Sequence, residues 1–330
     1  MGLLVNGTWQ DKWYDTKSTG GRFVRQDAAF RNWVTEDGSA GPTGEAGFKA
    51  EADRYHLYVS LACPWAHRTL ILRSLKGLTD KISLTVVDPL MLEEGWTIKG
   101  NFADTIPDSV NHKTRMYEIY AAAKNDYTGR VTVPVLWDKK QNTIVSNESA
   151  DIIRMLNTGF NALDGVDASL DLYPETSRAE IDAINASVYD RVNNGVYKSG
   201  FATNQAAYEE AVTALFDELD SLETRLSKQR YLAGNRITEA DWRLFTTLIR
   251  FDAVYHGHFK CNFRRIADYP NLSNYMRELY QVPGVAETVN IAHIKHHYYA
   301  SHRTINPTGI VPLGPVEDFN APHNRTTQKF

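Results

Sequence analysis

The sequence contains two cysteines, and one of them lies where a thiol becomes reactive. Cys63 opens the motif Cys63-Pro64-Trp65-Ala66, between a predicted strand and a predicted helix. Proline is tolerated in the first turn of a helix, so Pro64 is expected at position N1 and Cys63 at the N-cap. The partial positive charge and the N–H groups of a helix N-terminus stabilise a thiolate over a thiol. The motif therefore favours a nucleophilic cysteine over the alternative, a buried and inert thiol.

This nucleophile lacks the neighbour that a dithiol oxidoreductase uses. The fourth position of a Cys-x-x-Cys motif is Ala66 here, and the other cysteine, Cys261, lies within the segment 259–263. Cys261 is either a structural thiol or a resolving one. If Cys63 forms a disulfide during turnover, the second sulfur comes most simply from a small-molecule thiol, and glutathione is the obvious candidate.

Two further motifs could hold a peptide-like thiol. Val133-Pro134 interrupts a strand-like run, where proline requires an edge, a bulge or a cis turn. Such a turn would offer backbone N–H and C=O groups to an extended peptide, as an added strand would. Glu148 and Ser149 open a predicted helix, where Ser149 and the backbone donors suit a carboxylate and Glu148 attracts an ammonium group.

The elements that must position these motifs are predicted from hydrophobic period. In order they are a strand over 55–60, a helix over 64–75, strands over 82–87, 131–137 and 143–145, and a helix over 148–157. The first three form a βαβ unit, whose strands should be parallel.

Beyond residue 173 the strand pattern disappears. Apolar residues within 208–226 recur at steps of three and four, as an amphipathic helix requires. Thr238 suits an N-cap with Asp241 at N3, and the following segment 242–251 is apolar nearly all round, which predicts a buried central helix. The second half is therefore predicted to be a helical bundle.

The fold class that follows is an α/β N-terminal domain plus an all-α C-terminal domain. Residues 1–50, rich in glycine and polar residues with scattered aromatics, are interpreted as an irregular N-terminal arm. The α/β domain is expected over 51–160 with an insertion at 88–125, and the helical domain with a C-terminal tail over 173–330. A length of 330 residues accommodates two such cores.

Charge and hydropathy limit the partners. Lys and Arg total 36 against 40 Asp and Glu, a net charge of −4, which gives no broad cationic field for nucleic acid or acidic lipid. No stretch approaches the roughly 20 apolar residues of a membrane span, and the first residues lack the pattern of a secretory signal. We therefore expect a cytoplasmic protein with reduced cysteines, acting on small molecules.

In the order Cys-Pro-x-x, Val-Pro and Glu-Ser, the motifs resemble those of the glutathione transferase superfamily. The chain is most similar to the glutathionyl-hydroquinone reductases, the Xi class, over nearly its whole length. That similarity includes the N-terminal arm, Gly95-Trp96, the stretch 129–135 and the tail from His297 to Gly309. It implies a thioredoxin-like N-terminal domain, an all-helical C-terminal domain and a homodimer.

The resemblance also implies a reaction, the glutathione-dependent reduction of glutathionyl-hydroquinones to hydroquinones. A Cys63–glutathione mixed disulfide would form, and a second glutathione would resolve it as glutathione disulfide. Besides Cys63, the implied catalytic residues are Tyr197, as proton donor, and Tyr255 and Tyr298, whose phenols can face the thiol and the aromatic substrate. The implied glutathione-binding residues are Trp96, Arg130, Val131, Thr132, Val133, Glu148 and Ser149.

Other functions remain as alternatives. A general glutathione thiol transferase or dehydroascorbate reductase shares the Cys63 step and differs in the substrate pocket. A non-catalytic glutathione-fold interaction module has no use for a nucleophilic cysteine at a helix N-terminus. A zinc site is not expected, because no standard zinc-finger spacing is found among His256, His258, His293, His296, His297 and His302.

Overall fold

The computed structural model describes residues 2–330, and its backbone divides into two units. The first unit comprises Met1–Trp13, Gln26–Asp171 and Thr288–His297. The second comprises Tyr14–Arg25, Leu172–Glu287 and Tyr298–Phe330. The N-terminal arm is therefore shared between the two units, with its residues 14–25 belonging to the helical one.

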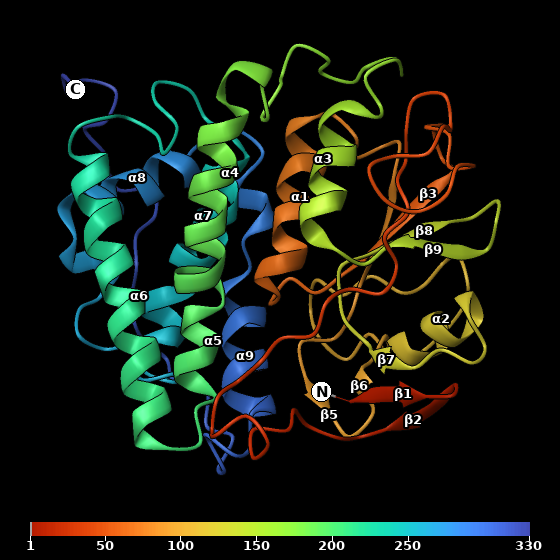
Figure 1. Ribbon diagram of the computed structural model, residues 1–330, viewed down its shortest axis with the longest axis horizontal. Helices are drawn as coiled ribbons and strands as arrows, with labels where there is room; N and C mark the ends of the chain where they lie inside the picture. The colour runs from red at the N-terminus through yellow and green to blue at the C-terminus, as the bar shows by residue number, and fades with distance from the viewer. Residues whose placement is uncertain (1) are drawn as a thin grey trace. The chain divides into compact units, whose positions relative to one another are not determined.

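A four-stranded sheet forms the core of the first unit. Its strands are β3 (Tyr55–Val59), β4 (Ser83–Val86), β8 (Val135–Asp138) and β9 (Thr143–Ser146), in the order β4-β3-β8-β9. The βαβ prediction is confirmed, because β3 and β4 are parallel and α1 (Pro64–Leu75) connects them. The other two pairings are antiparallel. Helix α3 (Ser149–Thr158) lies beside α1 (Figure 1).

Part of the arm has regular structure that the sequence interpretation missed. Strands β1 (Leu3–Val5) and β2 (Thr8–Gln10) form a hairpin, and β1 also pairs with β7 (Gly129–Arg130). Strands of two or three residues are too short to show a hydrophobic period, so the sequence carries no usable signal for them. The pairing with β7 ties the start of the chain to the segment that precedes Val133.

The insertion at 88–125 is also ordered. It contains β5 (Met91–Leu92), β6 (Gly95–Trp96) and α2 (Met116–Ala123). The buried carboxylate of Asp88 accepts hydrogen bonds from the Thr97 hydroxyl at 2.8 Å and from two backbone N–H groups farther along the loop. One buried carboxylate with three donors thus fixes the loop that carries Trp96.

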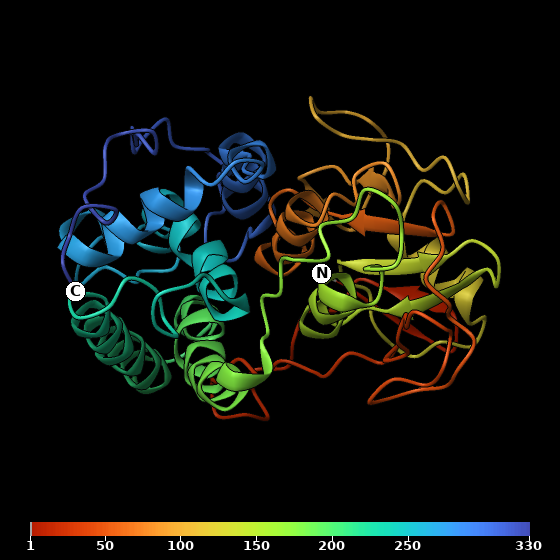
Figure 2. The ribbon, with the colours of Figure 1, turned by 90° about the horizontal axis from the view of Figure 1, so that it is seen from above.

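Helices make up most of the second unit (Figure 2). They are α4 (Arg178–Ser187), α5 (Gly195–Gly200), α6 (Gln205–Leu226), α7 (Glu239–Arg250) and α8 (Pro270–Tyr280), with π-helices η2 (Val188–Asn193) and η3 (Phe251–Tyr255) and 3-10 turns Glu175–Ser177, Ile266–Asp268 and Ala286–Thr288. Helix α9 (Ile291–Ser301) contributes residues to both units. Within residues 2–330, no helix is both long and apolar enough to cross a membrane.

The central helix of the bundle is α7, as predicted. All of its residues are buried, and its N-terminus has the predicted capping box. Asp241 Oδ2 accepts hydrogen bonds from the Thr238 N–H at 2.7 Å and from its hydroxyl at 3.0 Å. The other carboxylate oxygen accepts from the Tyr275 hydroxyl at 2.7 Å, which joins α7 to α8.

Candidate active site

Cys63 lies at the N-terminus of α1, as the sequence predicted. It is the N-cap residue, with φ −77° and ψ 121°, and Pro64 begins the helix. The residue is 9% exposed, and its Sγ lies 3.5 Å from the carbonyl oxygen of Val133. The helix N-terminus is an environment that favours the anionic form of a thiol.

The loop that contacts Cys63 has a cis proline, one of the three alternatives that the sequence left open. The Val133–Pro134 peptide bond is cis. Preceding it, the Thr132 carbonyl accepts a hydrogen bond from the Tyr120 hydroxyl at 2.9 Å, and the Asn147 side-chain amide donates to the same hydroxyl at 3.1 Å. Tyr120 is fully buried, so this network holds the loop rigidly beside the thiol.

Glu148 and Ser149 open α3 beside this loop. The Glu148 carboxylate caps the helix by accepting from the Ala150 N–H at 2.9 Å, and the Ser149 hydroxyl lies 3.4 Å from the same oxygen. The guanidinium of Arg68 donates to the Ser149 hydroxyl at 3.3 Å and is 1% exposed. A buried positive charge at a helix N-terminus creates a place for an anionic group.

Arg68 was missed by the sequence interpretation. Arginine within an amphipathic helix usually reads as a surface residue, because its charge is costly to bury. Here its Cζ lies 4.6 Å from the centre of the Trp65 ring, so the aromatic residue of the Cys-Pro-Trp motif also contacts the guanidinium. The position of Arg68 three residues, or about one helical turn, after Trp65 is the signal that could have identified it.

Trp96 and Arg130 make their contacts elsewhere in the first unit. The Trp96 ring is stacked on that of His297, with centroids 4.6 Å apart and planes at 20°. The Arg130 guanidinium donates to the backbone carbonyls of Lys12 and, at 3.0 Å, Trp13. Arg130 therefore fastens the arm to β7.

The valines of the same stretch are well packed. Val131 is 2% and Val133 is 4% exposed. Of this stretch, the Val133 carbonyl lies beside the Cys63 thiol.

The three candidate tyrosines come together in the second unit. The hydroxyl of Tyr298, on α9, lies 2.6 Å from that of Tyr197, on α5, and 3.0 Å from that of Tyr255, at the end of η3. Burial, the largest cause, raises the pKa of Tyr255 and of Tyr298 well above the ordinary value for tyrosine. Both phenols are consequently protonated near neutral pH and can act as hydrogen-bond donors.

Tyr197 lies in α5, just after an irregular helical segment. A π-helix ends at Asn193, a single turn residue follows, and α5 begins at Gly195. A π-helix widens the spacing of side chains along the chain and is frequent at functional sites. The same geometry recurs at η3, which ends at Tyr255.

The second cysteine is fully buried. Cys261 has no exposed surface, and burial raises the pKa of its thiol to about 12. Its Sγ lies 3.8 Å from the carbonyl oxygen of Phe259. Neither Cys63 nor Cys261 forms a disulfide. The environment of Cys261 is that of a structural residue.

The histidines near the C-terminus are engaged in other contacts. His258 Nε2 lies 3.2 Å from His302 Nδ1. The rings of His293 and His297 each form a hydrogen bond with a backbone carbonyl. Over residues 2–330, His, Cys, Asp and Glu side chains form no group of three or more that could hold a metal ion.

Two family models match the chain. The N-terminal domain of glutathione S-transferase matches residues 62–158, and the C-terminal domain of glutathione S-transferase matches residues 205–278. The glutathionyl-hydroquinone reductase YqjG of Escherichia coli is 60% identical over 98% of both chains. The glutathionyl-hydroquinone reductase PcpF of Sphingobium chlorophenolicum is 54% identical over 96% of this chain and 97% of that protein.

The chain belongs to the glutathionyl-hydroquinone reductases of the glutathione S-transferase family.

Solved structures of this family agree. The glutathione-bound structure of the Escherichia coli protein covers 99% of both chains at 56% identity, with a TM-score of 0.92. The Xi-class glutathione transferase of Natrialba magadii covers 99% of this chain and 97% of its own, at 48% identity and a TM-score of 0.90. The predicted fold class, thioredoxin-like followed by all-helical, is confirmed.

Proposed function

We propose that the enzyme uses glutathione to reduce glutathionyl-hydroquinones to hydroquinones, with Cys63 as the nucleophile. The observation that carries this proposal is the thiol of Cys63 at the N-terminus of α1, 3.5 Å from the carbonyl of the cis-proline loop. The names of the relatives supply the substrate class. The glutathione bound in the Escherichia coli structure supports glutathione as the co-substrate.

The reaction balances with two glutathione sulfurs and one proton. The Cys63 thiolate attacks the sulfur of the thioether, the bond between sulfur and the ring carbon breaks, and its electron pair remains on the ring carbon. A proton from Tyr197 converts that carbon to C–H. A second glutathione thiolate then attacks the Cys63 mixed disulfide, releasing glutathione disulfide and restoring the Cys63 thiolate.

Glutathione is an extended tripeptide with two carboxylates and one ammonium group, and we assign these groups to the first unit. The backbone of Val131, Thr132 and Val133 would pair with the peptide as an added strand does. The N-terminus of α3 with Ser149 would hold a carboxylate, with the buried Arg68 adding positive charge. Glu148 would attract the ammonium group.

Trp96 and Arg130 remain part of the proposed glutathione site. Their present contacts with His297 and with the arm carbonyls give each a fixed position. Substituting either residue should raise the KM for glutathione more than it lowers kcat. Loss confined to kcat would remove that residue from the binding site.

Tyr197, Tyr255 and Tyr298 are proposed to serve the aromatic substrate. Two of these phenols have a raised pKa, which suits hydrogen-bond donation to a quinol oxygen. Their rings offer an apolar wall to a planar molecule. Tyr197 is the most exposed of the three, at 9%.

Mass spectrometry of the trapped intermediate tests the proposal. Enzyme mixed with a glutathionyl-hydroquinone, without free glutathione, should gain one glutathionyl group on Cys63 and release one equivalent of hydroquinone. Added glutathione should discharge the group as glutathione disulfide. An enzyme that reduces disulfides or dehydroascorbate but leaves the thioether intact would be a general thiol transferase instead.

We further propose a cellular location and an oligomeric state for the enzyme. Both cysteines are free, which fits a reducing, cytoplasmic compartment. We also propose a homodimer, as is common for this fold. Light scattering of the purified protein should give twice the 37.3 kDa mass of the chain. A mass of one chain would overturn the dimer.

A further inference from the structure

The arm segment Tyr14–Arg25 packs against helices of the second unit. The N–H of Thr203 donates to the Gly21 carbonyl at 3.0 Å, and the Asn204 side chain donates to the Gly20 carbonyl at 2.9 Å. Gly21 has φ +83°, and a Cβ there would lie 2.2 Å from the Asn204 amide nitrogen. A side chain at position 21 would displace the Asn204 side chain and strain the backbone, which favours glycine there. The two hydrogen bonds anchor the backbone of the arm at the start of α6.

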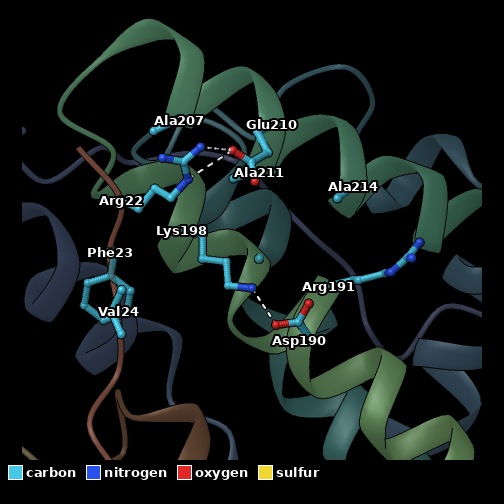
Figure 3. Close-up of a pocket in the computed structure, with 11 residues that line it drawn as sticks. Arg22, Phe23, Val24, Asp190, Arg191, Lys198, Ala207, Glu210, Ala211 and Ala214 are labelled. Carbon is cyan, nitrogen blue, oxygen red and sulfur yellow. Dashed lines mark hydrogen bonds and ion pairs between the residues drawn. The ribbon is translucent and has the colours of Figure 1, made fainter. Parts of the chain in front are cut away.

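Beyond this anchor, the arm crosses a gap. Arg22 forms an exposed ion pair with Glu210 of α6 at 2.6 Å (Figure 3). Beneath it lies a cavity of about 250 Å³, bounded on one side by Arg22, Phe23 and Val24 and on the others by α5, α6 and residues 190–191. Side chains do not fill this space. The path of the arm therefore depends on the hydrogen bonds at residues 20–21 and on the contacts of Phe23 and Arg25.

Those contacts are made to Tyr197. The Phe23 ring is buried, and its centre lies 6.3 Å from that of the Tyr197 ring, with the two planes at 29°. The Arg25 guanidinium lies over the Tyr197 ring at 4.9 Å from its centre and also contacts Phe23 at 5.4 Å. The Arg25 Nε donates to Asn194 Oδ1 at 2.8 Å, which orients the guanidinium. The last residue of the arm segment therefore places a fixed positive charge on the face of the proposed proton donor.

A cation on the face of a phenol has a definite effect. It is attracted to the ring, and the attraction increases when the phenol loses its proton and becomes negative. The charge therefore makes proton donation easier, whereas burial makes it harder for the neighbouring phenols. The charged and titratable groups around this cluster are Arg25, Tyr255, Tyr298, Arg250, His258 and His302.

We propose that Arg25 is a positioning residue for the reaction, one that holds the Tyr197 ring and favours release of its phenolic proton to the ring carbon of the substrate. This inference rests on the proposed function. It gives the N-terminal arm a part in catalysis, although the arm precedes the thioredoxin-like sequence that carries Cys63.

Two substrates separate this role from a structural one. Reduction of a glutathionyl-hydroquinone needs a proton on carbon, but reduction of the mixed disulfide of glutathione and 2-mercaptoethanol needs only the Cys63 thiolate, because its leaving group is a stable thiolate. Arg25→Met should lower kcat for the hydroquinone about tenfold with little change in KM, and should leave disulfide reduction unchanged. Arg25→Lys, which keeps the charge, should recover part of the loss.

The pH profile provides a second readout. Without the positive charge the Tyr197 phenol holds its proton more tightly, so the alkaline limb of kcat for the hydroquinone should move to higher pH in Arg25→Met. Arg22→Gln is the matched control, because it removes a charge from the same arm at an exposed ion pair of small energetic value. It should behave as wild type with both substrates.

The outcomes are distinct. Selective loss with the hydroquinone in Arg25→Met, with partial recovery in Arg25→Lys, supports the proposal. Equal loss with both substrates, or activity equal to that of Arg22→Gln, overturns it while leaving the proposed function standing. Wild-type enzyme that reduces the disulfide but not the hydroquinone would overturn both.

Discussion

The hydroxyl oxygen of Tyr298 lies 2.6 Å from that of Tyr197. With Tyr255 at 3.0 Å from the same Tyr298 hydroxyl, three phenols are joined by two hydrogen bonds. Each neutral phenol carries one proton, so two protons are used inside the trio and the third is directed to a group outside it. Tyr255 has no exposed surface and Tyr197 is 9% exposed, which makes Tyr197 the end from which a proton can leave.

Interrupting this trio should affect carbon protonation alone. We expect Tyr197→Phe to lower kcat for the glutathionyl-hydroquinone about 100-fold, the scale of general acid catalysis, and Tyr298→Phe to lower it less. Reduction of a glutathione mixed disulfide should be spared in both. Tyr208→Phe, which removes a phenol from an exposed hydrogen bond to the Lys260 carbonyl, is the control. A parallel loss of both activities would assign the trio to folding.

The two cysteines should differ completely in function. Cys63→Ser should abolish turnover of the glutathionyl-hydroquinone, because a hydroxyl at the same position is not a nucleophile toward sulfur at neutral pH. Cys261→Ser should retain most of the activity, since its thiol is buried and protonated. Steady-state rates of both variants, measured by chromatography of the hydroquinone product, test this prediction. Strong loss in Cys261→Ser, with the protein folded, would require a dithiol mechanism.

Alkylation should distinguish the same thiols in the wild-type protein. Cys63 at its helix N-terminus should react with iodoacetamide at a pH where an ordinary free thiol is slow. The pKa of Cys261 is raised to about 12, so that thiol should stay unmodified until the protein unfolds. Peptide mass spectrometry across a pH series gives both rates. Equal labelling of the two cysteines in the folded state would contradict this assignment.

Buried histidines should make the protein less stable in mild acid. His56 is fully buried between the hydroxyls of Ser83 and Thr85, and burial lowers its pKa to about 4. Between pH 6.5 and pH 4 the unfolded chain binds a proton at this position and the folded chain does not. The free energy of unfolding should therefore fall with falling pH, by about 1 kcal/mol per pH unit for this histidine.

Urea unfolding at pH 7.5, 6 and 5 measures this dependence. His56→Gln should reduce the slope of stability against pH even if it lowers stability overall. His112→Asn is the control, because His112 is exposed and asparagine tolerates its positive φ of 52°. An unchanged slope in His56→Gln would mean that His56 does not contribute to acid sensitivity.

Local chemistry explains which features could be predicted from the sequence. The cis turn at Pro134, the N-cap at Cys63 and the capping box at Thr238 follow from the properties of those residues in their immediate context. The helix over 64–75 follows from Pro64 at N1 and the apolar face behind it. Such features depend on a few neighbouring residues, which one sequence contains.

The remaining features depend on residues that are distant in sequence. From the sequence alone Arg68 is expected on the surface, because its contact with Ser149 forms only in the folded protein. Strand β1 is too short to show a hydrophobic period, so its pairing with β7 could not be predicted. The contact of Arg25 with Tyr197 likewise joins an irregular segment near the start of the chain to a helix that is distant in sequence. The spacing of neighbouring residues does not encode such long-range contacts. The contacts of Arg68 and Arg25 could therefore not be derived from the sequence.

The contacts of the arm also constrain the order in which parts of the chain can fold during synthesis. Arg22 is made 188 residues before its partner Glu210, and Arg25 is made 169 residues before Asn194. At about 5 to 20 residues per second on the ribosome, Phe23 and its neighbours leave the exit tunnel roughly 10 to 40 s before the helices that bury them exist. During that interval Phe23, which is buried in the folded protein, has no helices to pack against. The segment Tyr14–Arg25 therefore reaches its final place only after α5 and α6 have been made.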